Sequence, residues 1–444
     1  MGINPLVVAL SIGFLAYSAN AQEQRPKSQV EKNPNGTKIT ASVDAKHQTL
    51  VNLSELIEEA LRNNPEIQAA NKKIDSARAR AGQATYLEDP EVNFEAWGVP
   101  LNHPLKYRSA NPLIIGVRQK LPFFGKLGLR GEMAGEEVRI TEAELRAKEQ
   151  EIVAKIKTTY AEYFMANKAL EIYRELLELI QHTSATAEGL YQVGKAPQQD
   201  VIKALLERTE LLNKLTWAEK DLITSRARLN TLLSRPPDSF LGEPAEPVEG
   251  PILVKASDLE KIAIAQRPEL RALESSIARS EKAVELAERN RKYPDFMVGL
   301  QYWVAPDQET KHMYAPMVTL TIPFSPWTRG RHDYEVQEAL AERQAAKASI
   351  AAMKNMALFE VKEISAKFQA AIRSISLYRD GLLPQAEQSF QASVAAYQTG
   401  AVNFMTLLDA QRTIRDVRMG YYKALVDYEQ SRADLERAVG KELQ

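Results

Sequence analysis

The residues closest to a catalytic motif lie between Gly189 and Lys195, where the chain matches the phosphate-binding pattern G-x-x-x-x-G-K. That pattern needs a Ser or Thr after the lysine to bind magnesium, and a strand before the first glycine. Ala196 occupies the Ser/Thr position, and the residues before Gly189 are typical of a helix. The motif therefore predicts the end of a helix rather than a nucleotide site.

The side chains that bind transition metals show no recognisable ligand spacing. The histidines form no H-E-x-x-H pattern; they are His47, His103, His182, His312 and His332. Met353 and Met356 lie one helical turn apart, a spacing compatible with soft-metal binding but more typical of helix packing. Cysteine is absent, which excludes disulfides, thiolate sites and thiol nucleophiles. We therefore expect no catalytic residue, no metal and no cofactor.

Charge and composition exclude further classes of protein. The chain has 57 basic and 58 acidic residues among 444, a net charge of -1 and a pI of about 6.6. The broad basic field that nucleic-acid binding requires is therefore missing. A content of 44% hydrophobic and 26% charged residues is typical of an ordered chain. We expect a folded protein without a polynucleotide partner.

The N-terminal residues are typical of a secretory signal. An uncharged apolar run, 3–17, precedes Ala19-Asn20-Ala21, a small-x-small cleavage pattern before Gln22. No Lys or Arg precedes the run, so a retained membrane anchor stays as the alternative. The rest of the chain has no second apolar stretch long enough for a membrane-spanning helix. Any further contact with a membrane is expected to involve strands.

Two long stretches, 136–188 and 331–380, contain neither Gly nor Pro and are rich in Ala, Glu, Lys, Arg and Leu. They predict helices of roughly 75–80 Å at ~1.5 Å per residue, too long for a compact domain. Apolar residues recur in the first stretch at steps of three and four, which indicates helix packing. A partner helix follows each stretch after a turn, at 193–197 and at 399–402. Two antiparallel helical hairpins are therefore expected.

The two halves of the chain show the same order of parts, roughly 200 residues apart. The matching segments are 63–67 with 266–270, 121–123 with 322–324, and 191–194 with 397–400. A Pro-rich linker separates the halves. The predicted organisation is a signal peptide 1–21, a flexible segment 22–52, a first repeat 53–234, the linker 235–256 and a second repeat 257–444.

Each half also holds a pair of segments with the period of two that predicts strands. The four predicted strands are 91–99, 113–121, 295–304 and 314–322. Each is close to the ~9–11 residues that a tilted strand needs to cross a bilayer. Aromatic residues expected at the membrane interface are Trp97, Tyr302, Trp303, Tyr314 and Trp327. The alternative is a soluble, half-buried sheet. Four strands cannot close a membrane barrel, so the membrane interpretation requires a homo-oligomer that shares one.

These features together resemble the TolC family of outer-membrane efflux factors. The resemblance rests on the signal, the doubled order of helix, strand pair and helical hairpin, and the segments 382–386, 395–400 and 407–411. It implies a mainly α fold with a small β part, in which three subunits form a 12-strand barrel in the outer membrane. It also implies a long periplasmic α-helical barrel, built from the hairpins, that meets a periplasmic adaptor and an inner-membrane pump. Outer-membrane lipid is then a further partner.

In that family the hairpin tips close the periplasmic end like an iris, with acidic side chains around the constriction. The resemblance assigns Asp409 to this constriction, with Thr406 at a position that is often acidic and Asp200 past the first tip. Val402 replaces a basic latch residue, which leaves Asp200 without that partner. Ordinary solvated helix charge is the alternative for both aspartates. The tip residues expected to contact the adaptor are Val193, Gly194, Thr399 and Gly400.

The leading hypothesis is a passive exit channel driven by a partner pump. A periplasmic coiled-coil adaptor or scaffold would also need export and long helices, but adaptors typically have one central hairpin, whereas this chain has two in tandem. An enzyme, whose catalytic residues would have to meet only in space, is the third hypothesis. The cargo, whether drug, metal ion, siderophore or protein, is not readable from the sequence.

Overall fold

The computed structural model describes residues 50–99, 102, 112–248, 250, 256–305, 309 and 311–443. The expected signal peptide lies outside the described residues, as do most of the segment 22–52 and the residues His47 and His103. The described residues belong to one structural unit, Gln48–Gln444.

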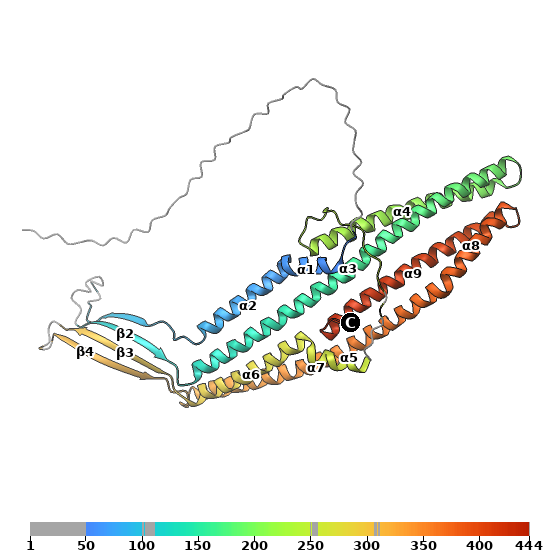
Figure 1. The fold of residues 1–444 in the computed structure, drawn as a ribbon. Coiled ribbons are helices and arrows are strands. Elements are labelled where there is room, and N and C mark those ends of the chain that lie inside the picture. Colours follow the sequence, from blue (N-terminus) through green and yellow to red (C-terminus); the bar gives the residue numbers. More distant parts are fainter. Residues whose placement is uncertain are drawn as a thin grey trace, which may run out of the picture. The chain divides into compact units, whose positions relative to one another are not determined.

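The elements follow the same order twice along this unit (Figure 1). The first repeat contains α1 (Leu53–Asn63), α2 (Pro65–Gln83), β1 (Glu91–Ala96), β2 (Leu113–Leu121), α3 (Lys126–Gln192) and α4 (Gln198–Leu232). The second contains α5 (Ala256–Gln266), α6 (Pro268–Lys292), β3 (Phe296–Val304), β4 (His312–Leu320), α7 (Arg329–Leu377), a π-helical turn (Tyr378–Leu382), α8 (Leu383–Gln398) and α9 (Phe404–Val439).

The first long helix exceeds the stretch that lacks Gly and Pro. α3 begins at Lys126 and continues through Gly128, Gly131 and Gly135. Each helical Gly costs about 1 kcal/mol relative to Ala, but α3 packs along α2 and α6, where Lys282 forms an ion pair with Glu132. Tertiary packing supplies most helical stability. The 67 residues of α3 therefore form one helix of roughly 100 Å.

The second long helix also continues past Gly381, which follows the stretch 331–380 that contains neither Gly nor Pro. A π-helical turn contains Gly381, and Pro384 occupies the first turn of α8, where the missing N–H is tolerated. The ring of Tyr378 lies against Gly420 of α9, where a Cβ atom would come within 2.6 Å of its Cζ atom. The extra residue of a π turn changes the direction in which later side chains point. It lies between the part of α7 that packs on Ala424, Leu425 and Tyr428 of α9 and the part of α8 that enters the core near the tips.

One four-stranded antiparallel sheet combines both repeats, in the order β1-β2-β3-β4. The pairing of β2 with β3 joins the halves, with Leu113 opposite Val304 and Leu121 opposite Phe296. Because directly opposed side chains share a face, the register defines two faces. On one lie Val92, Phe94, Ile115, Val117, Val298, Leu300, Tyr302, Tyr314, Val318 and Leu320. On the other, called here the polar face, lie Glu91, Asn93, Glu95, Arg118, Lys120, Met297, Gln301, Trp303, Met313, Met317 and Thr319.

Two strands differ from their predicted ranges. β1 ends at Ala96 rather than at 99, because Gly98 adopts a left-handed backbone with φ of 72°. β4 spans His312–Leu320 rather than 314–322, because its ends follow those of β3, with His312 opposite Val304 and Leu320 opposite Phe296. β3 itself begins at Phe296, one residue later than predicted. Among the described residues, no helix combines the length and apolarity needed to cross a bilayer.

Candidate functional site

The two hairpin tips have the same backbone geometry. Gly194 and Gly400 adopt left-handed φ values of 71° and 75°, which favour glycine. The next residue closes each turn: Lys195 N–H donates to the Leu190 carbonyl at 2.8 Å, and Ala401 N–H to the Ala396 carbonyl at 2.8 Å. The equivalent turns explain why a Gly follows Val193 in one repeat and Thr399 in the other.

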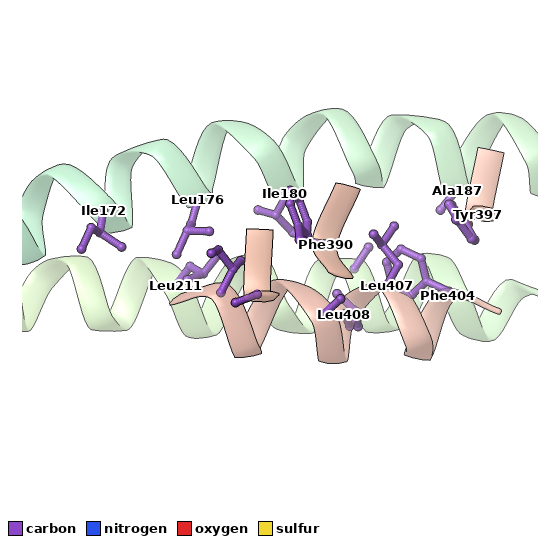
Figure 2. Close-up of a cluster of buried hydrophobic side chains, with 14 residues drawn as sticks. Ile172, Leu176, Ile180, Ala187, Leu211, Phe390, Tyr397, Phe404, Leu407 and Leu408 are labelled. Atoms are coloured by element: carbon purple, nitrogen blue, oxygen red, sulfur yellow. The ribbon is translucent and has the colours of Figure 1, made fainter. Parts of the chain in front are cut away.

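Side chains from both hairpins form one core behind the tips (Figure 2). Ile180 of α3, Leu211 of α4, Phe390 of α8 and Leu407 of α9 are all buried in this cluster. The rings of Tyr397 and Phe404 lie 5.5 Å apart at its end. The hairpins therefore hold each other in register over their last turns.

A cavity of about 540 Å³ lies between the tips, and Asp200 of α4 and Tyr397 of α8 both line it. Burial raises the pKa of Asp200, and Lys203 opposes that effect. Burial also raises the pKa of Tyr397, with a smaller contribution from Asp200. The buried Tyr397 hydroxyl has no hydrogen-bond partner among the described residues. Val402 lines the same cavity, and its uncharged side chain cannot form an ion pair with Asp200.

Asp409 and Thr406 lie apart from this cavity, on an exposed face of α9. Thr406 belongs to the helix cap, because its backbone N–H and its hydroxyl both donate to the Asn403 side chain at 3.0 Å. Asp409 forms no ion pair with any residue that the structure describes. The three predicted constriction residues thus divide into one in the cavity and two on the exposed face.

A buried ion cluster behind the tips was missed by sequence reasoning. Glu207 of α4 is only 2% exposed, and accepts a hydrogen bond from Arg412 Nε of α9 at 2.9 Å. Arg415, one helical turn further along α9 and 11% exposed, has its Nη1 atom 3.6 Å from the second carboxylate oxygen. The hydrogen bond that Arg412 donates to the Glu207 carboxylate raises the pKa of Arg412. The arginine spacing of three is the signal that could have indicated a shared partner.

The sheet exposes its apolar face. Val92 is 73% exposed and Val318 69% exposed, and the large apolar side chains between them on the sheet are largely exposed as well. The half-buried residues of the sheet belong mostly to the polar face. A continuous apolar surface of this kind marks contact with lipid or with another protein.

The structure brings some of the predicted interface aromatics together and separates others. Tyr302 and Tyr314 lie on the apolar face near the loop ends of β3 and β4, with ring centroids 5.3 Å apart. Trp303 lies on the polar face, opposite Met313. Trp97 follows β1, and its indole N–H donates to Glu95 at 3.2 Å. Trp327, which is 85% exposed, lies between β4 and α7 at the helical end of the sheet.

A second aromatic group at that helical end was not predicted. Phe123, just after β2, stacks on Tyr293, just before β3, with centroids 4.4 Å apart and an interplanar angle of 8°. Phe296 lies 6.1 Å from Phe123 in a further stacked arrangement. Aromatic side chains therefore lie at both ends of the apolar face, as expected where a sheet meets two membrane–water interfaces.

A cavity of about 420 Å³ lies where the linker between the repeats meets α3 and α9. Tyr160 holds the linker there, because its hydroxyl donates to the Val51 carbonyl at 3.0 Å and accepts from Ala245 N–H at 2.8 Å. Glu429 lines the same cavity. Burial raises its pKa, although Arg432 and Lys157 favour the ionised form.

Glu429→Gln is expected to stabilise the protein at pH 8 and to leave its stability unchanged at pH 4. A carboxyl group whose folded-state pKa is raised loses stability as pH rises from the unfolded-state pKa through the folded-state pKa. Glutamine does not ionise, so the variant escapes that loss. Thermal unfolding of both proteins between pH 4 and 8 measures the difference. Equal midpoints at every pH would contradict the expectation.

No group of three His, Asp or Glu side chains capable of holding a metal ion occurs among the described residues. A sheet with an exposed apolar face, joined to two long helical hairpins with matched tips, is the architecture of an outer-membrane channel with a helical periplasmic part. This is the class of protein that the fold and the site define.

Comparison with known proteins agrees with that class. Residues 56–235 and 259–441 match the family described as "Outer membrane efflux protein". The cobalt-zinc-cadmium resistance protein CzcC of Cupriavidus metallidurans is 22% identical, over 98% of this chain and 99% of its own. The pyoverdine export outer membrane protein OpmQ of Pseudomonas putida is 22% identical, over 87% and 85%. The structure of the outer membrane protein VceC of Vibrio cholerae aligns with a TM-score of 0.73 at 20% identity, over 88% of this chain and 97% of that one.

The chain therefore belongs to the outer membrane efflux protein family. It is the outer-membrane channel component of a tripartite efflux system, and its helical part lies in the periplasm. The alternative of a periplasmic adaptor is not favoured.

Proposed function

We propose that three copies of this chain form a passive duct from the periplasm to the exterior. The observation that carries the proposal is the sheet: within the described part of the chain its outer strands β1 and β4 each have one unpaired edge, and its apolar face is exposed. Unpaired backbone groups in lipid cost several kcal/mol each. Pairing of β4 with β1 of a neighbouring copy removes both edges, and the resemblance to the TolC family supports three copies.

The hairpin tips form the gate of this duct. Thr406 and Asp409 are exposed on one face of α9, the position required of a ring that lines a narrow axis. Three copies of Asp409 repel one another when the tips approach, and attract cations. Asp200 has a different part in this arrangement, because it lies in the cavity between the tips with Tyr397. It couples one tip to the other rather than lining the axis.

The tips also contact a periplasmic adaptor, through Val193, Gly194, Thr399 and Gly400. Val193 is exposed at the first tip, and the cavity between the tips is lined by both turns, so a partner can reach both repeats at once. The adaptor joins the duct to an inner-membrane pump that supplies the energy. The chain itself catalyses no reaction.

The choice of cargo belongs to the pump rather than to the duct. The name of CzcC refers to cobalt, zinc and cadmium resistance and that of OpmQ to pyoverdine export, yet both are equally identical to this chain. Sequence identity over the whole chain therefore does not indicate which substrate is transported. The gene beside this one, if it encodes a pump, is the most direct indicator of what is expelled.

Gly400→Pro is expected to abolish efflux while the oligomer still assembles in the outer membrane. Proline fixes φ near -65°, whereas Gly400 has φ of 75°, so the second tip loses its turn and its contact with the adaptor. Gly189→Ala is the matched control, because a Cβ atom at Gly189 meets nothing within 4 Å. Accumulation of an efflux substrate in cells measures the effect, and heat-modifiable mobility of membrane fractions measures assembly. Unchanged efflux with Gly400→Pro would count against the role of the tip.

A further inference from the structure

A connected row of aromatic rings leads from the apolar face of the sheet toward the helices. Phe296 lies on that face, because it is opposite Leu320 in the register of β3 and β4. Its ring is 6.1 Å from that of Phe123, which in turn contacts the ring of Phe124 edge-to-face at 5.8 Å. Phe124 is 83% exposed. The apolar face therefore continues past the end of the sheet and finishes in an exposed ring.

This row of rings lies at the middle of the sheet. Phe123 and Phe124 follow β2, and Phe296 begins β3, which are the two central strands in the order β1-β2-β3-β4. A neighbouring copy that paired with β1 or β4 would meet the edges of the sheet instead. The exposure of Phe124 is therefore expected to persist in the oligomer.

A guanidinium group lies beside the exposed ring. Arg289, in the last turn of α6, donates from Nη1 to the Phe124 carbonyl at 3.1 Å. Gly125 makes room for it, because a Cβ atom there would lie 2.6 Å from Nη1 and 3.2 Å from Cζ of Arg289. Arg289 forms no ion pair with any residue in the described part of the chain. The backbone is thus shaped around a cation that has a carbonyl partner but no carboxylate.

The neighbouring carboxylates are already held by other cations. Asp333 is shared between Arg291 at 3.2 Å and Arg329 at 3.8 Å, so one carboxylate balances two guanidinium groups only in part. Three further pairs have distances of 2.8–3.5 Å: Asp295 with Lys126, Glu288 with Lys292 and Glu285 with Lys282. The charge of Arg289 is therefore available to an anion from outside the chain.

We propose that Phe124 and Arg289 bind an anionic phospholipid in the inner leaflet of the outer membrane. The planar guanidinium matches two oxygens of the phosphodiester, while the Phe124 ring lies at the level of the headgroups and upper acyl chains. A headgroup with net negative charge is preferred to a zwitterionic one, whose own ammonium group competes for the phosphate. The placement in the inner leaflet rests on the proposed function, in which the sheet crosses the membrane, whereas the lipid preference does not.

Titration of the full-length protein in detergent with phosphatidylglycerol, and separately with phosphatidylcholine of the same acyl chains, tests the site. Native mass spectrometry measures the bound lipid. We expect the wild type to bind phosphatidylglycerol about fivefold more tightly, the effect of roughly one basic group near an anionic lipid. Arg289→Gln is expected to bring this ratio to about one, and Arg289→Lys, which keeps the charge, to retain most of it.

Arg208→Gln is the matched control, because it removes one exposed arginine from α4, close to the hairpin tips and away from the sheet. We expect it to keep the lipid ratio of the wild type. Phe124→Ala changes only an exposed ring and is expected to weaken the binding of both lipids. It keeps the site testable if Arg289→Gln does not fold, which the thermal midpoint of each variant shows.

Three results would overturn the lipid site: equal affinity of the wild type for both lipids, an unchanged ratio in Arg289→Gln, or an equal loss in Arg208→Gln. Release of phosphatidylglycerol by an equal concentration of inorganic phosphate would also overturn it, because the site would then take a free anion. The same spectra report the number of copies. A protein found only as single copies would reject the three-copy duct, while the lipid ratio would still decide the role of Arg289.

Discussion

Leu300→Arg is expected to abolish assembly of the protein in the outer membrane, whereas Gln301→Arg, one residue further along β3, is expected to leave assembly intact. Leu300 is on the exposed apolar face, between Val117 on β2 and Pro316 on β4. An arginine at the lipid-facing midplane of such a sheet costs about 2–4 kcal/mol. The cost is incurred in every copy of the oligomer, so a large loss of assembled protein follows.

Gln301 is a close control, because it lies on the same strand and faces the opposite side, beside Gly116 and Ala315. An arginine there enters a surface that already carries Arg118 and Lys120. Membrane fractionation and heat-modifiable electrophoresis measure both variants. Normal assembly of Leu300→Arg, or equal loss in both variants, would show that the apolar face does not meet lipid.

Glu207→Ala is expected to open the periplasmic end of the duct and to destabilise the contact between the hairpins. The carboxylate of Glu207 is the partner of Arg412 and Arg415 on α9. The substitution removes charge-assisted hydrogen bonds, worth about 1.5–3 kcal/mol each, although Arg412 stays partly exposed near Glu210. Without Glu207, Arg415 keeps only the exposed Asp416 as a partner, at 2.8 Å, and the tie between α4 and α9 is lost. We expect a several-fold rise in single-channel conductance and a lower thermal midpoint.

Glu175→Ala separates this effect from a general loss of charge between the hairpins. Glu175 of α3 pairs with Arg418 of α9 at 3.1 Å, but its side chain is 55% exposed. Exposed ion pairs contribute about 0–1 kcal/mol, so conductance and stability are expected to stay near the wild type. A conductance for Glu207→Ala equal to that of Glu175→Ala would reject the buried cluster as a restraint on the gate.

The periodicity of the sequence was sufficient for the type and order of the main elements. The family and the outer-membrane location were implied by a resemblance that the doubled order of helix, strand pair and hairpin carries, and the comparisons confirm both. Helix ends were less predictable, because Gly128 and Gly381 act as breakers only where packing does not compensate for them. Strand ends such as His312 depend on the partner strand, which the local sequence does not encode.

The site residues also differ in whether the local sequence or a distant contact determines their position. Glycines at the tips were predictable, since a left-handed turn restricts the choice of residue at one position. Glu207 was not, because its partners lie more than two hundred positions away on the other hairpin. The placement of Trp303 on the polar face follows from the register with β2 and β4, and a shift of one residue would have reversed it. The roles of the tip and constriction residues remain proposals.

The ladder between β2 and β3 has a consequence for how such a protein arose. It is the one strand pairing by which the described halves meet in the sheet, and it is equivalent in kind to the pairing that we propose between β4 and a neighbouring copy. A gene half this long would therefore encode a complete building block, six of which could enclose the same pore. Fusion of two such blocks allows the two halves to diverge in sequence. In this chain they differ just after the tips, where Asp200 follows the first tip and Thr406 occupies the equivalent position after the second.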